Sequence, residues 1–318
     1  MVTNTFSSGV NTSFSTELNE NFTEAETTAS DNYTIMVSAY SPTLPETFGG
    51  TGADGAKTVS SSEDIAAGAY NWSSLTINSG QTLGLSSGNY IYAKVTGNVN
   101  IIGTIDLSED GAAGGSAVTD TDGINGTIGS EVSNGTIGAG ALGPDGANNA
   151  GAGGGGGGSY FSGEDGEESN ATAGGHGGYG YPLRRYLGDT LPPNTIILPF
   201  YGAGGGSGGS RQDGYSGKGG TGGGCLIIEC AGNITVSGTI NVSGEDGGDG
   251  TLGSPVNVNG GGGGGGSGSI FIYYKGTLSE TTPTYNTSGG TGGLKSGTGG
   301  DGGDGGDGIA FFQKILAT

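Results

Sequence analysis

Glycine is the residue that most limits what this chain can build, because 78 of its 318 residues are glycine. Glycine loses more backbone entropy on folding than any other residue and buries almost no apolar surface. Backbone hydrogen bonds between closely packed segments must therefore replace much of an ordinary side-chain core. The competing interpretation is a flexible glycine/serine spacer. The apolar residues cluster in short β-like runs, which argues against a spacer.

The other residues in the glycine tracts recur with a period of three. The clearest case is 299–308, Gly-Gly-Asp-Gly-Gly-Asp-Gly-Gly-Asp-Gly, and 289–293, 174–179 and 204–210 follow the same pattern. The extended left-handed helix has three residues per turn and rises about 3.1 Å per residue. Glycine on two of its three faces lets neighbouring helices pack backbone to backbone, which predicts polyglycine II-like layers. The chain has only 9 prolines, none of them in these tracts, and this argues against collagen.

Short apolar runs separated by glycine, serine and asparagine predict β-strands in the rest of the chain. Residues 93–111 resemble residues 230–247, with Gly97-Asn98-Val99 matching Gly232-Asn233-Ile234. A repeated strand–turn–strand unit predicts stacked β architecture, as in solenoids, and chance similarity in a biased composition is the alternative. Glycine tracts also run directly into apolar strands that begin at 225, 269 and 309. This recurrence indicates parallel or antiparallel layers stacked in register.

The predicted fold is mainly β with polyglycine II-like layers, arranged as a stacked β/polyglycine sandwich or a solenoid and preceded by a short helix. The predicted parts are an attachment segment at 1–30, a β-rich domain at 31–150 and a glycine-rich domain at 151–318. In the first part, Phe14, Leu18 and Phe22 form one apolar stripe at helical spacing. A lone amphipathic helix needs another subunit or a partner protein to cover that stripe.

The net charge of −21, from 30 acidic and 9 basic residues, limits the partners. Nucleic acids and anionic membrane surfaces both require clustered lysine and arginine, so we expect neither as a partner. No apolar run is long enough to span a membrane, and the N-terminus lacks the features of a secretory signal. Abundant carboxylates suit a protein kept soluble in concentrated salt, so a virus of a halophilic host is one predicted source.

The two cysteines, Cys225 and Cys230, lie five residues apart in an apolar run. On a strand this offset places them on opposite faces, so we expect no disulfide between them. We interpret both as small buried hydrophobic residues.

Two parts of the chain resemble known viral proteins. Residues 6–22, which include Gly9 and the run Leu18-Asn19-Glu20-Asn21-Phe22, resemble the N-terminal attachment segment of tailed-virus fibre proteins. Residues 150–318 are similar, in the order of their tracts, to the polyglycine-sandwich adhesins at the tail-fibre tips of T-even phages. The resemblance implies a homotrimeric virion protein that joins other virion proteins through Phe14, Leu18, Asn19 and Phe22. It also implies that loops between layered glycine helices contact the host, through a surface glycan or an S-layer-type protein.

Residues 181–201 interrupt the glycine tracts with a segment that contains almost no glycine. All the arginines of the chain lie in or near it, together with several aromatic residues. Arginine and tyrosine are enriched in binding hot spots, so this segment is the candidate receptor contact. A packing excursion at a small core or subunit interface is the alternative. The candidate receptor-binding residues are Tyr181, Arg184, Arg185, Tyr186, Phe200, Tyr201, Arg211 and Tyr215.

We do not expect an enzyme. The single histidine, His176, lies in a glycine tract with no nucleophile motif nearby, and the acidic group 164–168 is typical of a solvated face. Residues 302–310 fit the nine-residue calcium β-roll pattern once, which makes Asp304 and Asp307 candidate calcium ligands. The alternative is that both carboxylates form the solvated edge of a glycine helix. No other cofactor is predicted.

The predicted function is therefore a tail fibre or receptor-binding adhesin of a virus particle. A capsid turret or decoration fibre with a structural role is one alternative. A cellular surface adhesin is another.

Replacing Arg184 and Arg185 with alanine should reduce adsorption of particles to host cells while particles still assemble, because the receptor loses two cationic contacts. Counting adsorbed particles against time measures this effect. Unchanged adsorption by assembled particles would rule out the receptor interpretation of residues 181–201.

Overall fold

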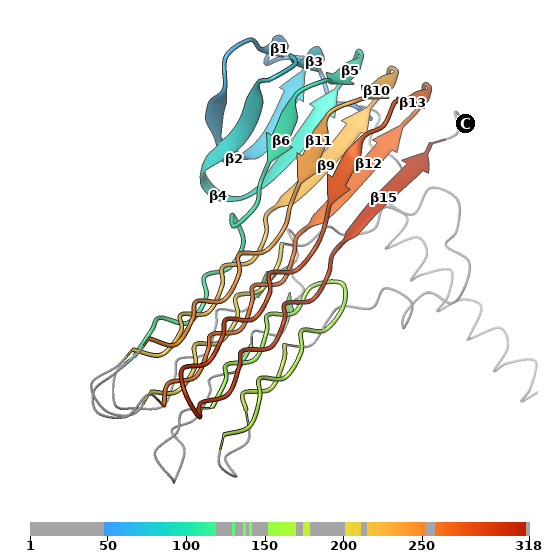
Figure 1. The fold of residues 1–318 in the computed structure, drawn as a ribbon. Helices are drawn as coiled ribbons and strands as arrows, with labels where there is room; N and C mark the ends of the chain where they lie inside the picture. The colour runs from blue at the N-terminus through green and yellow to red at the C-terminus, as the bar shows by residue number, and fades with distance from the viewer. Residues whose placement is uncertain are drawn as a thin grey trace, which may run out of the picture. The chain divides into compact units, whose positions relative to one another are not determined.

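The computed structural model describes residues 48–118, 129–130, 136–137, 140–141, 152–169, 174–178, 201–210, 215–251 and 258–315. These residues form a mainly β structure, and none of them is in a helix (Figure 1). The predicted β class is confirmed. The predicted N-terminal helix lies outside the described residues.

Along the sequence the strands fall before and after residue 150, and glycine tracts lie between these two groups and within the second one. In chain order they are β1 (Ala56–Val59), β2 (Glu63–Trp72), β3 (Ser74–Ile77), β4 (Thr82–Val95), β5 (Val99–Ile101), β6 (Thr104–Asp106), β7 (Gly129–Ser130), β8 (Thr136–Ile137), β9 (Cys225–Cys230), β10 (Ile234–Val236), β11 (Thr239–Asn241), β12 (Ser269–Tyr274), β13 (Leu278–Glu280), β14 (Thr284–Asn286) and β15 (Ile309–Lys314).

Parallel pairing organises the two main sheets. One sheet has the order β1-β3-β5-β10-β13, and the other has the order β14-β11-β6-β4-β9-β12-β15 with β2 paired to β4. The long strand β4 pairs with β6 near its start and with β9 near its end, so the second sheet curves into a nearly closed, barrel-like arrangement. The short strands β7 and β8 form a separate antiparallel pair.

Successive turns of the chain stack in register. Val99 of β5 pairs with Ile234 of β10, and Thr104 of β6 pairs with Thr239 of β11. These are the positions that the internal repeat matches, so the predicted stacking is confirmed. The three junctions from tract to strand are also in register, because Ser269 pairs with both Cys225 and Ile309, and all of these pairings are parallel.

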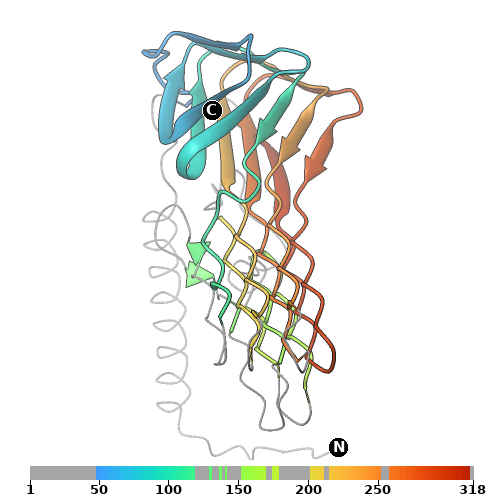
Figure 2. The same cartoon turned by 60° about the vertical axis from the view of Figure 1, so that its left-hand side comes forward.

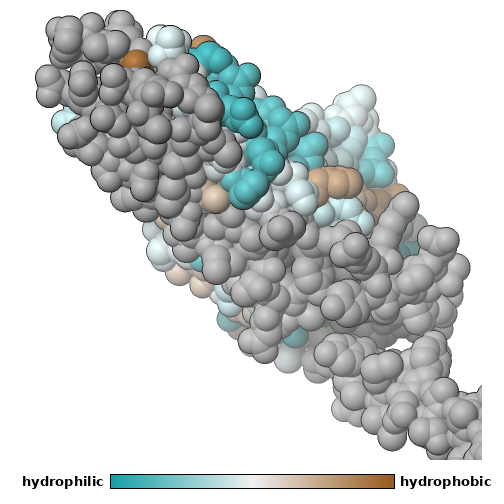
Figure 3. Space-filling view, turned by 90° about the horizontal axis from the view of Figure 1, so that it is seen from below, coloured by the Kyte–Doolittle hydropathy of each residue, from teal (hydrophilic) through white to brown (hydrophobic). Residues whose placement is uncertain are grey.

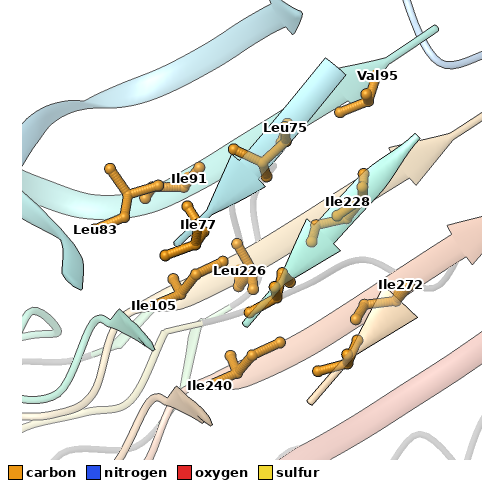
Figure 4. Packing of buried hydrophobic residues seen from close by; sticks show 14 of the residues in the cluster. Leu75, Ile77, Leu83, Ile91, Val95, Ile105, Leu226, Ile228, Ile240 and Ile272 are labelled. Atoms are coloured by element: carbon orange, nitrogen blue, oxygen red, sulfur yellow. The ribbon is translucent and has the colours of Figure 1, made fainter. Parts of the chain in front are cut away.

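The sheets enclose one apolar core, to which alternate residues of each strand contribute. Ile91 of β4 and Leu226 of β9 occupy paired positions, as do Ile228 of β9 and Ile272 of β12 (Figure 4). Fully burying such a side chain contributes about 1.5–3 kcal/mol relative to exposure. Cys230 faces this core, whereas Cys225 lies on the opposite face of β9. Both cysteines are buried and unpaired, as predicted.

Aromatic residues close both ends of the stack. Tyr70 and Trp72 of β2 stack with ring centroids 4.9 Å apart. At the other end, Tyr285 of β14 meets Phe312 of β15 at 5.0 Å. Large rings thus cover the ends of the core, whereas the interior positions paired with them hold smaller residues. Phe312 pairs with Ile272 and Tyr285 with Ile240, and Tyr70 and Trp72 pair with Ala93 and Val95. Atypical terminal units are expected where stacking must stop.

The glycine tracts continue from the strands and lie side by side (Figure 2). Their backbone hydrogen bonds recur at every third residue. Gly261, Gly264 and Ser267, for example, donate to the carbonyls of Gly300, Gly303 and Gly306. The central tract, 258–268, bonds to six described segments, which are 152–159, 202–210, 215–224, 242–250, 287–294 and 299–308.

The number of tracts that surround a given tract explains whether its sequence is unbroken glycine or glycine interrupted by other residues. The central tract is buried along its whole length, and a Cβ on Gly263, Gly264 or Gly265 would overlap a backbone carbonyl of a neighbouring tract. In the outer tract 299–308, Asp304 and Asp307 are exposed and the glycines between them face neighbours. Continuous glycine therefore marks an enclosed tract, and the Gly-Gly-Asp repeat marks a tract with one face in solvent.

Strands from both sides of residue 150, the predicted boundary between two domains, share sheets. β4 pairs with β9, β5 with β10 and β6 with β11. The described residues before and after this position belong to one compact unit.

Replacing Gly264 with alanine should destabilise the protein by about 1–3 kcal/mol or more, because rigid backbone must move away from the new methyl group. The melting temperature, followed by circular dichroism, measures the effect. Thr291→Ala is the matched control. Thr291 is exposed and lies in the neighbouring tract whose backbone the new methyl group at position 264 would overlap. Equal melting temperatures for both variants would contradict the tight packing of the central tract.

Candidate functional site

The tracts have one end at the strands and one end away from them. Gly224 and Gly268 lead directly into β9 and β12 and mark the strand end. Tyr215, Thr251 and Leu294 lie at the opposite ends of their tracts, and we call the region that these three residues define the distal end. The tracts reach it below the strands in Figure 1.

Tyr215 is held through its backbone while its side chain remains open to solvent. Its N–H donates to Oγ1 of Thr251 over 2.9 Å. The Thr251 N–H and hydroxyl donate to the Tyr215 carbonyl over 2.9 and 3.2 Å. The residue is nevertheless 60% exposed. The bonds therefore fix the backbone of a tyrosine whose side chain the described structure does not bury.

Leu294 is held in the same way on the other side of the tract 242–251. Its N–H donates to Oδ1 of Asp249 over 2.8 Å, and its carbonyl accepts the Gly250 N–H over 2.8 Å. Leu294 is 63% exposed. Tyr215 and Leu294 therefore flank the same end of one tract.

The lysines near this end are paired with carboxylates. Lys218 binds Glu245, and Lys295 binds Glu167 at 2.5 Å and Asp301 at 3.3 Å. The hydrogen bond to Glu167 is the main cause that raises the pKa of Lys295. Burial opposes ionisation of Glu245, but the bonds from Lys218 and Thr221 outweigh it and lower the pKa of Glu245. Among the described residues around the distal end, the charge left over is negative.

The aspartates of the Gly-Gly-Asp repeat bind the neighbouring tract. Oδ1 of Asp301, Asp304 and Asp307 accepts the backbone N–H of Lys295, Gly292 and Gly289 over 2.6–2.9 Å. Each carboxylate thus accepts a hydrogen bond from a backbone N–H group that does not bond to a glycine carbonyl of a neighbouring tract. Among the described residues, no group of three or more His, Cys, Asp or Glu side chains is arranged to hold a metal ion. Asp304 and Asp307, the candidate calcium ligands, are thus seen as hydrogen-bond acceptors.

The structure separates the two described residues of the candidate receptor set. Tyr201 precedes Gly202, which bonds to Gly223 at the strand end, whereas Tyr215 lies at the distal end. The other receptor candidates lie outside the described residues: Tyr181, Arg184, Arg185, Tyr186, Phe200 and Arg211. The attachment candidates Phe14, Leu18, Asn19 and Phe22 also lie outside them.

Sequence reasoning did not find Thr251 and Leu294. The available signal was the interruption of the three-residue pattern at Leu294-Lys295, where an apolar residue replaces the usual small or acidic one. Which tract end lies beside Tyr215 depends on how the tracts turn, and no local pattern encodes that. His176, also considered in the sequence, is exposed, with its Nδ1 3.6 Å from Oδ2 of Asp165.

A second group of charged residues lies where β6 passes into the first glycine tract. Burial, together with the charges of Asp106, Asp64 and Glu109, raises the pKa of Asp110 to about 6. The backbone there is fixed by Asn89, whose Nδ2 donates to the carbonyls of Asp110 and Gly111 over 2.8 Å. The junction therefore holds a carboxyl group whose ionisation at neutral pH disfavours the folded state.

No family model, curated protein or solved structure matches this chain. Within the part of the chain that the structure describes, no helix is long and apolar enough to cross a membrane.

Replacing Asp110 with asparagine should stabilise the protein near pH 7 by about 1 kcal/mol, a value reduced for solvent screening of a half-buried group. The pKa is raised on folding, so the stabilising contribution of this carboxyl is complete below its ordinary pKa of 3.8. It is lost as the pH rises through about 6. The gain from Asp110→Asn should therefore vanish at acidic pH.

Denaturant unfolding at a series of pH values measures this dependence. Glu168→Gln is the control for the change in net charge, because Glu168 is exposed. A gain from Asp110→Asn that is the same at acidic and neutral pH would contradict the raised pKa.

Proposed function

We propose that this chain is a structural attachment protein on the outside of a virus particle, a tail fibre or receptor-binding adhesin. The observation that carries the proposal is that the tract 258–268 is hydrogen-bonded to six described segments, with bonds recurring at every third residue. Such a pattern is what a bundle of polyglycine II helices requires. It is also the architecture implied by the resemblance to polyglycine-sandwich adhesins.

In this proposal the described unit combines a β-solenoid with a polyglycine II bundle. Three consecutive short strands form each full turn of the solenoid, as in β9-β10-β11 and β12-β13-β14, and each turn leads into a glycine hairpin. Among the described glycines, positive φ values occur at Gly49, Gly50, Gly52, Gly55, Gly68, Gly80, Gly88 and Gly297, none of them in the tract 258–268. Negative φ in that tract fits the left-handed extended helix.

The bundle suits a projecting part of a particle. Nine residues of such a helix span about 28 Å, and every helix inside the bundle is hydrogen-bonded on all sides. Opening one helix would expose unpaired donors and acceptors along its length, so the bundle resists bending and local unfolding. A stiff support of this kind holds its distal end at a fixed distance from the solenoid.

The proposed partners follow the sequence analysis. Residues 1–30 join other virion proteins, three chains assemble as a homotrimer, and the distal end faces a host surface glycan or S-layer-type protein. The negative charge of −21 keeps the projecting part soluble and repels anionic surfaces. The face in Figure 3 fits this picture, because hydrophilic residues predominate on its coloured atoms and hydrophobic residues occur in small groups.

The position of the chain on the particle tests the proposal. Thr291→Cys introduces an exposed thiol for maleimide-linked gold, and electron microscopy should show gold at the tail or fibre tip. Wild-type particles are the control and should stay unlabelled, because burial raises the pKa of Cys225 to about 12 and that of Cys230 to about 11. Gold spread over the capsid shell would indicate a decoration protein, and particles without the chain would indicate a cellular adhesin.

A further inference from the structure

Two of the large hydrophobic residues that the structure leaves exposed lie at the distal end. In the described part of the chain, these exposed residues are Ile102, Phe161, Tyr215 and Leu294. Tyr215 and Leu294 both border the tract 242–251 through Thr251 and Gly250. Phe161 is 58% exposed, but its N–H bonds to Asp307 at the strand end. Only at the distal end of the described structure, therefore, do two of these exposed residues flank the end of a single tract.

From this arrangement we infer a docking surface, formed by Tyr215 and Leu294, for a protein whose exposed apolar residues are surrounded by lysine or arginine. The inference deepens the proposed function and rests on it for the direction in which the distal end points. It names the partner of that end by its chemistry.

The first argument is preorganisation. The backbones of Tyr215 and Leu294 are each fixed by hydrogen bonds to a tract that is itself part of the bundle. Binding a partner therefore costs little backbone ordering at either anchor. The side chains are exposed although small residues close to them in the sequence are buried, as at Ser216 and Ser296.

The second argument is charge. Asp249 lies directly under Leu294, and Glu167 and Asp301 lie beside the next residue, Lys295. Lys295 and Lys218 are both neutralised in ion pairs, so the described surroundings of Tyr215 and Leu294 remain acidic. An interface gains specificity and association rate when opposite charges meet around an apolar centre. The partner that fits carries basic residues around its own apolar ones.

The third argument is that Leu294 favours a protein over a saccharide as the partner. A tyrosine ring suits either one, because its face is apolar and its hydroxyl is polar. A leucine side chain has no ring face and no hydrogen-bonding group to offer a sugar. An exposed aliphatic residue and an exposed aromatic residue at the end of one tract instead suit a surface that another protein covers.

The test uses the full chain and three probes, which are a peptide with the sequence Lys-Leu-Trp-Leu-Lys, its counterpart Asp-Leu-Trp-Leu-Asp, and cellohexaose. Titrations followed by intrinsic fluorescence or calorimetry compare the wild type, the double variant Tyr215→Ala/Leu294→Ala and the variant Phe161→Ala. Only the basic peptide should bind measurably, and added salt should weaken it. The double variant should lose at least about fivefold in affinity, whereas Phe161→Ala should not.

Phe161→Ala is the matched control because it removes an equally exposed ring from the other end of the bundle. Melting temperatures equal to the wild type establish that the variants are folded. Four results would each overturn the inference. The first two are equal binding of both peptides and no binding of any probe. The other two are binding of cellohexaose that the double variant loses, and binding of the basic peptide that the double variant keeps. The experiment needs no particle, so its failure leaves the gold-labelling result for the proposed function intact.

Discussion

The structure depends on a steric constraint, namely that neighbouring backbones in the glycine tracts approach so closely that a side chain has no space between them. An added Cβ on Gly264 would meet the carbonyl of Gly290, and one on Gly302 would meet that of Gly262. The same closeness allows each tract to exchange hydrogen bonds with neighbours in several directions. A single backbone hydrogen bond contributes about 0.5–1.5 kcal/mol net, so many must act together to offset the entropy that glycine loses. Cooperation among tracts thus takes the place of a side-chain core.

The stacked strands supply the order that the tracts lack. Glycine offers no side chain to distinguish one register from another, whereas a slip of one residue in a strand would turn its apolar residues out of the core. Cys225, Ser269 and Ile309 are paired side by side, so the tracts that precede them enter the bundle at fixed relative heights. The side-chain core is therefore small but sets the register for the whole described unit.

Sequence reasoning succeeded where a local pattern reflects a local cause. The match between 93–111 and 230–247 correctly indicated stacked strands, because equivalent positions on neighbouring strands face the same core. The separation of Cys225 and Cys230 followed from the two-residue period of a strand. The same reasoning placed Tyr201 and Tyr215 in one candidate site, although they lie at opposite ends of antiparallel tracts. Proximity in sequence is a poor guide when each tract carries the chain the length of the bundle.

By itself the sequence determined that the glycine tracts would form closely packed, ordered backbone and that the strands would repeat and stack. It also determined that a period of three would set which residues of a tract face solvent. These properties follow from the backbone geometry of single segments. Only the tertiary structure decided that the tract 258–268 lies at the centre, that the aspartates at 301, 304 and 307 bind the adjacent tract, and that Tyr215 and Leu294 flank one tract end. The physical reason is that glycine tracts are nearly interchangeable, so their order in the bundle depends on long-range strand pairing and on turns between tracts.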